Sequence, residues 1–200
     1  MTNHLQETLT GLFASKVRAQ ALGYLIPRNH RGFSLSELAR ATGISTSSLQ
    51  HECYKLASLG ILTDRREGNA RRYSVNNDHP MVPALTTLVV LGVGMGPMLR
   101  AAVEDLDLTC RVAIAGSLDP GADPASVLVV GDATFLDFSV LEGRLANIFR
   151  AVDLPLPPLA YYADDDWQAR LRSGNALVAT WCAGPGTTVF GPPIVPSWGP

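Results

Sequence analysis

Paired cysteines are absent from this sequence. Its three cysteines, Cys53, Cys110 and Cys182, lie far apart and form no C-x-x-C motif. An odd number of scattered cysteines argues against a disulfide-linked fold and against a thiolate metal site, and it is typical of proteins in a reducing compartment. We therefore expect a cytoplasmic protein that holds no metal and needs no cofactor.

Charge and long apolar stretches are also scarce. Only 17% of the residues are charged and 46% are hydrophobic, a composition that suits one large or two small folded domains. Residues 1–10 lack the basic and apolar regions of a secretion signal. The uncharged run at residues 85–99 contains Gly92, Gly94, Gly96 and Pro97, so it is too short and too broken to cross a bilayer. We expect it to lie in a buried linking helix, with no membrane contact.

The charges that are present divide unevenly along the chain. Residues 1–80 contain ten Lys/Arg and six Asp/Glu, a balance of +4, whereas residues 81–200 contain six and twelve, a balance of −6. A basic first part joined to an acidic second part suggests that only the first part meets a polyanion.

Two helices are expected before residue 44. From Gly11 onward, apolar residues recur at steps of four and predict one helix that ends before Pro27: Phe13, Val17, Ala21 and Leu25. Ser34 and Glu37 then have the spacing of a capping box, which predicts the start of a second short helix. Gly43 allows a sharp turn after it.

A third helix is expected from Ser45 or Thr46, as N-cap, to Gly60. Three apolar residues at i, i+4 and i+7 predict its inward face: Leu49, Cys53 and Leu56. The short hydroxyls near its start can approach phosphates, and longer polar side chains can reach base edges in a major groove. The candidate DNA contacts of this segment are Ser45, Thr46, Ser47, Ser48, Gln50, His51 and Lys55, and Tyr54 is also left on the outside.

A β-hairpin is expected at residues 61–75, with its turn at Glu67–Gly68–Asn69. Its two arms contain four arginines, Arg65, Arg66, Arg71 and Arg72. Arginines on both sides of a tight turn are suited to bind the phosphates of a nucleic acid backbone.

Residues 11–78 resemble a winged-helix domain of the ArsR-like kind, through SLSELARATGISTSSLQHECYKLASLGIL and RREGNARRYSV. The resemblance implies a helix-turn-helix whose third helix contacts DNA, with the hairpin as the wing. ArsR-like metal sensors often have paired cysteines near that helix, whereas Cys53 stands alone on its inward face, so we do not expect metal sensing. A winged helix that contacts only proteins is the alternative, and the arginine-rich hairpin favours DNA.

The second part alternates predicted strands and helices, which indicates an α/β sheet. Strands are expected at 111–115, 127–130 and 156–163, and helices at 138–152 and 164–174. Asp164, Asp165 and Asp166 are consecutive, so they favour a helix N-terminus over a metal cluster. The proline-rich tail at 185–200 is expected to pack as an extended strap or to fray.

Residues 91–192 resemble the minimal nucleotidyltransferase domain related to the polymerase-beta type. The resemblance rests on the Gly116-Ser117 turn, the strand end VLVVGD and the segment DDDWQARLRSGN. Active relatives have Arg-Gly after Gly-Ser, and Ser-Asp-x-Asp before the second strand. Here Pro120-Gly121 replaces the first pair, and Pro124 and Ser126 occupy the positions of the two metal-binding aspartates.

The missing carboxylates argue against catalysis. Two carboxylates on alternate strand positions hold the metal ions that nucleotidyl transfer requires. Asp119 and Asp123 lie in a Gly/Pro loop that fixes no geometry, and Asp132 lies past the far end of the strand. We therefore expect no catalytic residues and no metal ligands. Gly116 and Ser117 remain candidate ligand-binding residues, since backbone N–H groups at such a turn can hold a phosphate; the alternative is a turn that only packs.

The sequence thus predicts an α+β protein with a winged helix-turn-helix domain at 1–80, a linking and dimerisation helix at 81–109, and a degenerate nucleotidyltransferase-like domain at 110–200. The linking segment is expected to form one long helix or two helices broken at GVGMGP, and its glycines suit a dimer seam or burial against its own domain. We expect a homodimer that binds double-stranded DNA and regulates transcription, is not an enzyme, and receives a small-molecule or protein effector at its C-terminal domain. The alternatives are an active nucleotidyltransferase targeted by the winged helix, and a DNA-bound scaffold for a protein partner.

Overall fold

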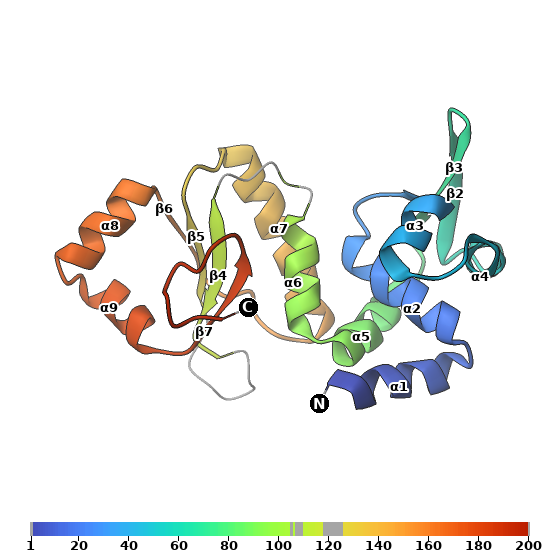
Figure 1. Cartoon of the computed structure of the whole chain (residues 1–200), viewed down its shortest axis with the longest axis horizontal. Coiled ribbons are helices and arrows are strands. Elements are labelled where there is room, and N and C mark those ends of the chain that lie inside the picture. Colours follow the sequence, from blue (N-terminus) through green and yellow to red (C-terminus); the bar gives the residue numbers. More distant parts are fainter. Residues whose placement is uncertain (1, 105, 107–109, 118–125, 200) are drawn as a thin grey trace. The chain divides into compact units, whose positions relative to one another are not determined.

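The computed structural model describes residues 2–104, 106, 110–117 and 126–199, and within them the chain forms two compact units. Unit 1 contains Met1–Ala101 and Ala151–Asp153, and unit 2 contains the remainder. Helices and strands occur in both units, so the expected α+β class is confirmed (Figure 1). The unit boundary differs from the expected ones at 80 and 109, because α5 (Val82–Val93) packs on α1 (Thr2–Phe13) inside unit 1.

Unit 1 combines helices with a small antiparallel sheet in the order β1-β3-β2. Its remaining elements are α2 (Lys16–Leu25), the 3-10 helix η1 (Ile26–Arg28), β1 (Phe33–Ser34), α3 (Leu35–Thr42), α4 (Thr46–Ser58), β2 (Leu62–Glu67), β3 (Ala70–Val75) and most of α6 (Met95–Val103). The β2–β3 turn lies at Gly68–Asn69, inside the turn that the sequence predicts.

The start of α3 has the predicted capping box. The Ser34 backbone N–H donates to the Glu37 carboxylate (2.7 Å), and the Ser34 hydroxyl accepts the Glu37 N–H (3.3 Å). Gly43 ends the helix in the left-handed conformation, with φ of 70°. Local sequence therefore determines both ends of α3.

The single helix predicted from Gly11 is wrong: the chain has two helices that meet at Ala14, whose φ is 50°. Ser15 provides the reason, since its hydroxyl accepts the Arg18 N–H (3.2 Å) and caps a new helix. The apolar spacing of four continues across this break, and therefore does not reveal it.

The apolar segment after the hairpin forms two helices, α5 and α6, which bend by 112° at Gly94. Among the described helices, no single one is long and apolar enough to cross a membrane; only this bent pair, counted together, has that length and composition. Gly92 is buried against α1, where a Cβ atom would lie 2.0 Å from Leu9 Cδ1. Gly92 therefore allows close packing of α5 against α1 within unit 1.

Unit 2 contains a mixed sheet in the order β6-β5-β4-β7, in which only β5 and β6 are parallel. Its elements are β4 (Arg111–Ala115), β5 (Ser126–Val130), α7 (Phe135–Ala151), β6 (Leu159–Tyr162), α8 (Asp164–Arg172), α9 (Ala176–Ala183) and β7 (Gly186–Phe190). Figure 1 shows α7 on one side of this sheet and α8 and α9 on the other.

The two faces of this sheet are both apolar, as expected for strands covered on both sides. One face packs against α8, α9 and the tail, in a cluster formed by Ala113, Ala115, Leu128, Val130, Trp167, Val178, Ile194, Val195 and Trp198. Because side chains alternate along a strand, the residues between them belong to the opposite face, and these too are buried: Val112, Ile114, Val127 and Val129.

Three features of unit 2 differ from the prediction. Helix α7 begins at Phe135 because Thr134 and Asp137 form a second cap, in which the Thr134 hydroxyl accepts the Asp137 N–H (3.1 Å). Helix α9 and strand β7 lie in segments for which no element was predicted. The tail does not fray: the Trp198 indole is buried and donates to the Gly184 carbonyl oxygen (3.1 Å).

Candidate nucleic-acid interface

Helix α4 has one buried face and one polar, exposed face. Ser45 is its N-cap, and the Ser45 hydroxyl accepts the Ser48 N–H (3.3 Å). The predicted inward residues Leu49, Cys53 and Leu56 are all buried. Burial and, next, the charge of Glu52 raise the pKa of the Cys53 thiol to about 11, so it is a neutral core side chain at physiological pH.

Glu52 is a buried carboxylate that the sequence did not reveal. It lies on the inward side of α4, and its Oε2 atom is 2.9 Å from the Nε of Arg18 on α2. Arg18 also donates to the Phe13 carbonyl oxygen (3.2 Å). Removing either partner would leave a buried group without its counter-charge, so this pair fixes α4 against the rest of unit 1.

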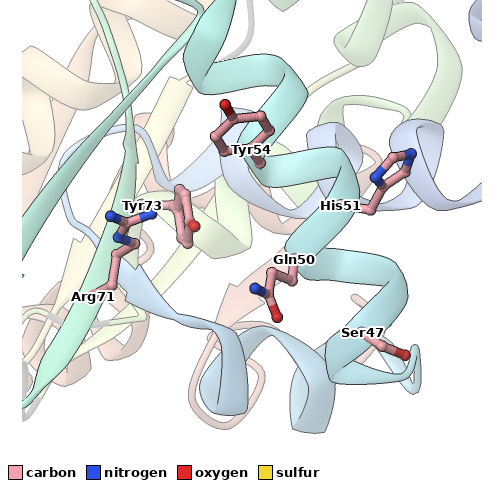
Figure 2. Close-up of a pocket in the computed structure, with 6 residues that line it drawn as sticks. All are labelled: Ser47, Gln50, His51, Tyr54, Arg71 and Tyr73. Carbon is pink, nitrogen blue, oxygen red and sulfur yellow. The ribbon is translucent and has the colours of Figure 1, made fainter.

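The exposed face of α4 borders a pocket of about 280 Å³ next to strand β3. It is lined by Ser47, Gln50, His51, Tyr54, Arg71 and Tyr73. In Figure 2, Gln50 and Tyr54 project from the side of α4 that faces the strand, whereas Ser47 and His51 project from the other side. The structure thus brings Arg71 together with three of the predicted contacts on α4, Ser47, Gln50 and His51.

Tyr54 and Tyr73 are two members of this pocket that the predicted set of contacts lacked. Tyr54 is exposed and follows Gln50 by four residues, so the helical period alone could have identified it. Tyr73 is buried and pairs with Asp64 across the hairpin. Its place beside α4 depends on strand register, which the sequence did not fix.

The β2–β3 hairpin presents different residues on its two faces. Arg66 pairs with Arg71, and Arg65 pairs with Arg72, in an antiparallel register. Because side chains alternate along a strand, Arg66 and Arg71 share the face of Tyr73, which borders α4, and Arg65 and Arg72 share the opposite face. The four arginines therefore form two pairs with different surroundings.

Arg65 and Arg66 have guanidinium groups available for a ligand, whereas Arg71 already has partners within the hairpin. Arg65 and Arg66 are exposed and make no ion pair within the described part of the chain. Arg71 lies 3.3 Å from the Asp64 carboxylate, and a hydrogen bond with Tyr73 and the charge of Asp64 raise its pKa. A second pocket, of about 380 Å³, is lined by Asp64, Arg65, Arg66, Asn69 and Arg71.

Arg72 differs from the other three arginines because three protein acceptors bind it. Its Nη1 atom donates to the Gly32 carbonyl oxygen (3.0 Å) and lies 3.2 Å from Glu37 Oε2, and its Nε lies 2.9 Å from Glu67 Oε2. Hydrogen bonds from Ser34, and next the charge of Arg72, lower the pKa of Glu37. The expected phosphate contact at Arg72 therefore competes with three acceptors: Glu67 on the hairpin itself, Gly32 just before β1, and Glu37 on α3.

The other predicted contacts lie at or near the same surface. Thr46 begins α4, and Ser47 and Ser48 lie in its first turn, where the Ser45 hydroxyl bonds with both of their hydroxyls (3.2 and 2.9 Å). Lys55 is exposed, with its Nζ 3.9 Å from Glu52 Oε1. This N-terminal turn and the pocket border one continuous exposed face of α4.

In unit 2, the backbone N–H of Gly116, in the candidate ligand-binding turn, already donates a hydrogen bond within the protein. Gly116 has φ of 92°, and its N–H donates to the Pro185 carbonyl oxygen (2.8 Å) beside β7. That donor is therefore engaged within the sheet. Ser117 is half-buried and has an interaction partner of its own.

The position of the second metal-binding aspartate is also defined. Ser126 is the first residue of β5 and pairs with Ala115 of β4. Pro120, Pro124, Asp119 and Asp123 lie outside the described residues. Asp132 follows the far end of β5, as the sequence indicates.

The consecutive acids of α8 form its first turn, as predicted, where they favour the positive end of the helix dipole. Asp164 forms an ion pair with Arg111, and Asp166 lies 2.9 Å from Arg170. These acids are accounted for by local structure.

Comparisons with protein-family models, with curated proteins and with solved structures find no match for this chain. Its function is therefore inferred from its own residues.

Proposed function

We propose that this protein is a sequence-specific, DNA-binding transcriptional regulator whose unit 1 is a winged helix-turn-helix domain. The observation that carries the proposal is the shared surface of α4 and the hairpin, where Gln50, His51 and Tyr54 line one pocket with Arg71. Helices α3 and α4, joined at Gly43, are the helix-turn-helix, and β2–β3 is the wing.

In this proposal α4 enters the major groove. Gln50 and His51 are exposed near its N-terminal half, where amide and imidazole groups reach base edges. Hydroxyls at the helix start and the cations Lys55, Arg66 and Arg71 bind phosphates on either side. Arg65, on the other face of the wing, is free to bind a neighbouring phosphate.

The regulator acts as a homodimer. One short recognition helix contacts few base pairs, and a two-fold dimer doubles the site while matching a palindromic operator. The glycines of the α5–α6 segment support a close helix contact, although Gly92 is occupied by Leu9 of the same chain. Sedimentation of the protein with and without a two-half-site duplex tests the stoichiometry.

Unit 2 is proposed to be a nucleotidyltransferase-like regulatory domain without catalytic activity, in a cytoplasmic protein. Ser126 at the start of β5 and Pro124 two residues earlier supply no carboxylate, and serine is a poor neutral ligand for a hard cation. A small-molecule or protein effector would bind this unit. Incubation with labelled nucleoside triphosphate and magnesium should transfer no label; labelling that is lost in Asp123→Ala would establish the enzyme instead.

The DNA-binding proposal is tested by selecting duplexes from a random pool with the full-length protein. We expect an enriched motif, bound at least about a thousandfold more tightly than random duplex. Gln50→Ala should change the enriched motif, while Gln168→Ala on α8, which removes the same exposed amide side chain from unit 2, should leave it unchanged. A wild-type protein that enriches no motif and binds no duplex would refute the proposal.

A further inference from the structure

An apolar surface is exposed on unit 2 at the start of α7 and on the neighbouring strand β6. On α7 the exposed fractions are 88% for Phe135, 71% for Leu136 and 37% for Val140, and on β6 that of Tyr161 is 43%. The Phe138 and Tyr161 rings meet edge to face with centroids 6.3 Å apart, which joins helix and strand. We call these five residues the α7–β6 patch.

The patch is not needed for the core of unit 2. Helix α7 packs through a separate set of buried residues, namely Leu141, Leu145, Ile148 and Phe149. A single exposed apolar side chain is ordinary, but a group with three aromatic rings marks an interaction surface in a folded protein. Strand β6 is also an edge strand of the sheet, so its outer side has no neighbouring strand among the described residues.

The rim of the patch is acidic. Asp132 and Asp137 lie at the start of α7, Glu142 follows one turn later, and Asp164 begins α8 directly after β6. Arg111 pairs with Val130 of β5, and Val130 pairs with Tyr162 of β6, so Asp132 and Asp164, which follow these two strands, lie at the same end of the sheet. Arg111, a cation at this end, forms an ion pair with Asp164, so these two charges offset each other.

We propose that the α7–β6 patch is a docking surface for a protein segment that combines lysine or arginine with apolar side chains. Charge complementarity selects this partner. Residues 102–200 contain five Lys/Arg and twelve Asp/Glu, a balance of −7, which repels nucleic acid and anionic lipid. Two patches with the same acidic rim repel each other, which disfavours a second copy. A basic, apolar segment buries the rings and neutralises the rim.

The experiment uses the full-length protein and two fluorescein-labelled amphipathic peptides with the same leucine pattern, one with lysine and one with glutamate at the polar positions. We expect the lysine peptide to bind at least about tenfold more tightly than the glutamate peptide. The double variant Phe135→Ser/Leu136→Ser should lose at least about tenfold in affinity for the lysine peptide. Leu177→Ser on α9, 53% exposed in the wild type, is the matched control and should bind as the wild type does.

Unchanged thermal midpoints will show that the variants are folded, as expected for exposed positions. If the double variant unfolds, Glu142→Lys tests the same surface through its rim and should weaken the lysine peptide. Equal binding of the two peptides, no binding of either, or an equal loss in Leu177→Ser overturns the proposal. So does a protein dimer that the double variant dissociates, because the patch would then belong to a second copy. DNA binding by these variants is measured in a separate assay. If the peptide experiment contradicts the docking surface, the proposed DNA-binding function still stands.

Discussion

Replacing Arg66 or Arg71 with alanine should reduce the salt dependence of DNA binding, whereas replacing Arg72 should not. The first two guanidinium groups share the hairpin face that borders α4. The third is held by Gly32, Glu37 and Glu67, and therefore has little to offer a phosphate. Identical substitutions in one hairpin should thus give different results.

The magnitude follows from counterion release. Each phosphate contact contributes about 0.9 to the slope of log affinity against log salt, so one arginine in each subunit of a dimer contributes about 1.8. Salt rises fourfold between about 50 and 200 mM, so the affinity deficit of Arg66→Ala should shrink by about tenfold over that range. Arg72→Ala should instead lower the free energy of unfolding by about 1 kcal/mol, because its carboxylate partners are partly exposed.

Fluorescence anisotropy of a labelled operator duplex, titrated at several salt concentrations, measures the slope, and urea unfolding measures stability. Arg172→Ala removes an arginine from unit 2 and controls for net charge. The division of the hairpin into two faces would be refuted by an Arg72→Ala slope that falls as much as that of Arg66→Ala. It would also be refuted by unchanged slopes in both Arg66→Ala and Arg71→Ala.

Three further predictions concern Cys53 in the core of unit 1, and the docked tail and the start of β5 in unit 2. Because the pKa of Cys53 is raised to about 11, the unfolded chain releases this proton first as the pH rises. The wild type should therefore lose up to about 1.4 kcal/mol of stability per pH unit above about 9, relative to Cys53→Ala in parallel urea titrations; coincident profiles would refute it. Trp198→Ala should cost about 3–5 kcal/mol in the same unfolding assay, since its buried ring covers Gly186, and a loss below about 1 kcal/mol would mean that the tail is not docked. Magnesium should leave the thermal midpoint of the wild type unmoved but raise that of Pro124→Asp/Ser126→Asp, which puts carboxylates at the first residue of β5 and two residues before it in the sequence; a wild type stabilised by magnesium contradicts this.

The sequence predicts most of unit 1 because its signals are local. The Ser34–Glu37 cap, the glycine turn at Gly43 and the inward face of α4 each depend on residues within one or two helical turns. The break at Ala14 was missed because an apolar stripe with a spacing of four continues through it. Glu52 was missed for a different reason: its partner Arg18 lies 34 residues away, and no local pattern joins the two.

The candidate site shows the same division between local and long-range information. Helical periodicity places Gln50 and Tyr54 on one side of α4 and Ser47 and His51 on another, and the sequence alone supports that. The hairpin register decides which arginines face α4, and a shift by one residue would exchange the two pairs. Sequence alone therefore groups Arg72 with the other arginines, whereas the cross-strand pairs place it on the face opposite Tyr73 and its contact with Glu37 joins it to α3.

In unit 2 the short apolar strands and α8 are predictable, but the tail is not. Proline-rich sequence with few charges suits an exposed strap as well as an edge strand. Strand β7 depends on pairing with β4, more than 70 residues earlier in the chain, and on the close packing of Trp198 over Gly186. Only these long-range contacts distinguish an edge strand from an exposed strap.

The charge of the two units assigns them different partners. Residues 1–101 contain eleven Lys/Arg and six Asp/Glu, a balance of +5, against −7 for residues 102–200. In the proposed regulator, a phosphate backbone is attracted to the first segment and repelled by the second, which favours DNA contacts at the surface formed by α4 and the hairpin. The same repulsion leaves the α7–β6 patch to partners of the opposite charge. If a basic segment binds there and alters DNA affinity, linkage requires DNA to alter the affinity of that segment by the same factor. Measuring both affinities, each with and without the other ligand, therefore decides whether unit 2 regulates unit 1 or only accompanies it.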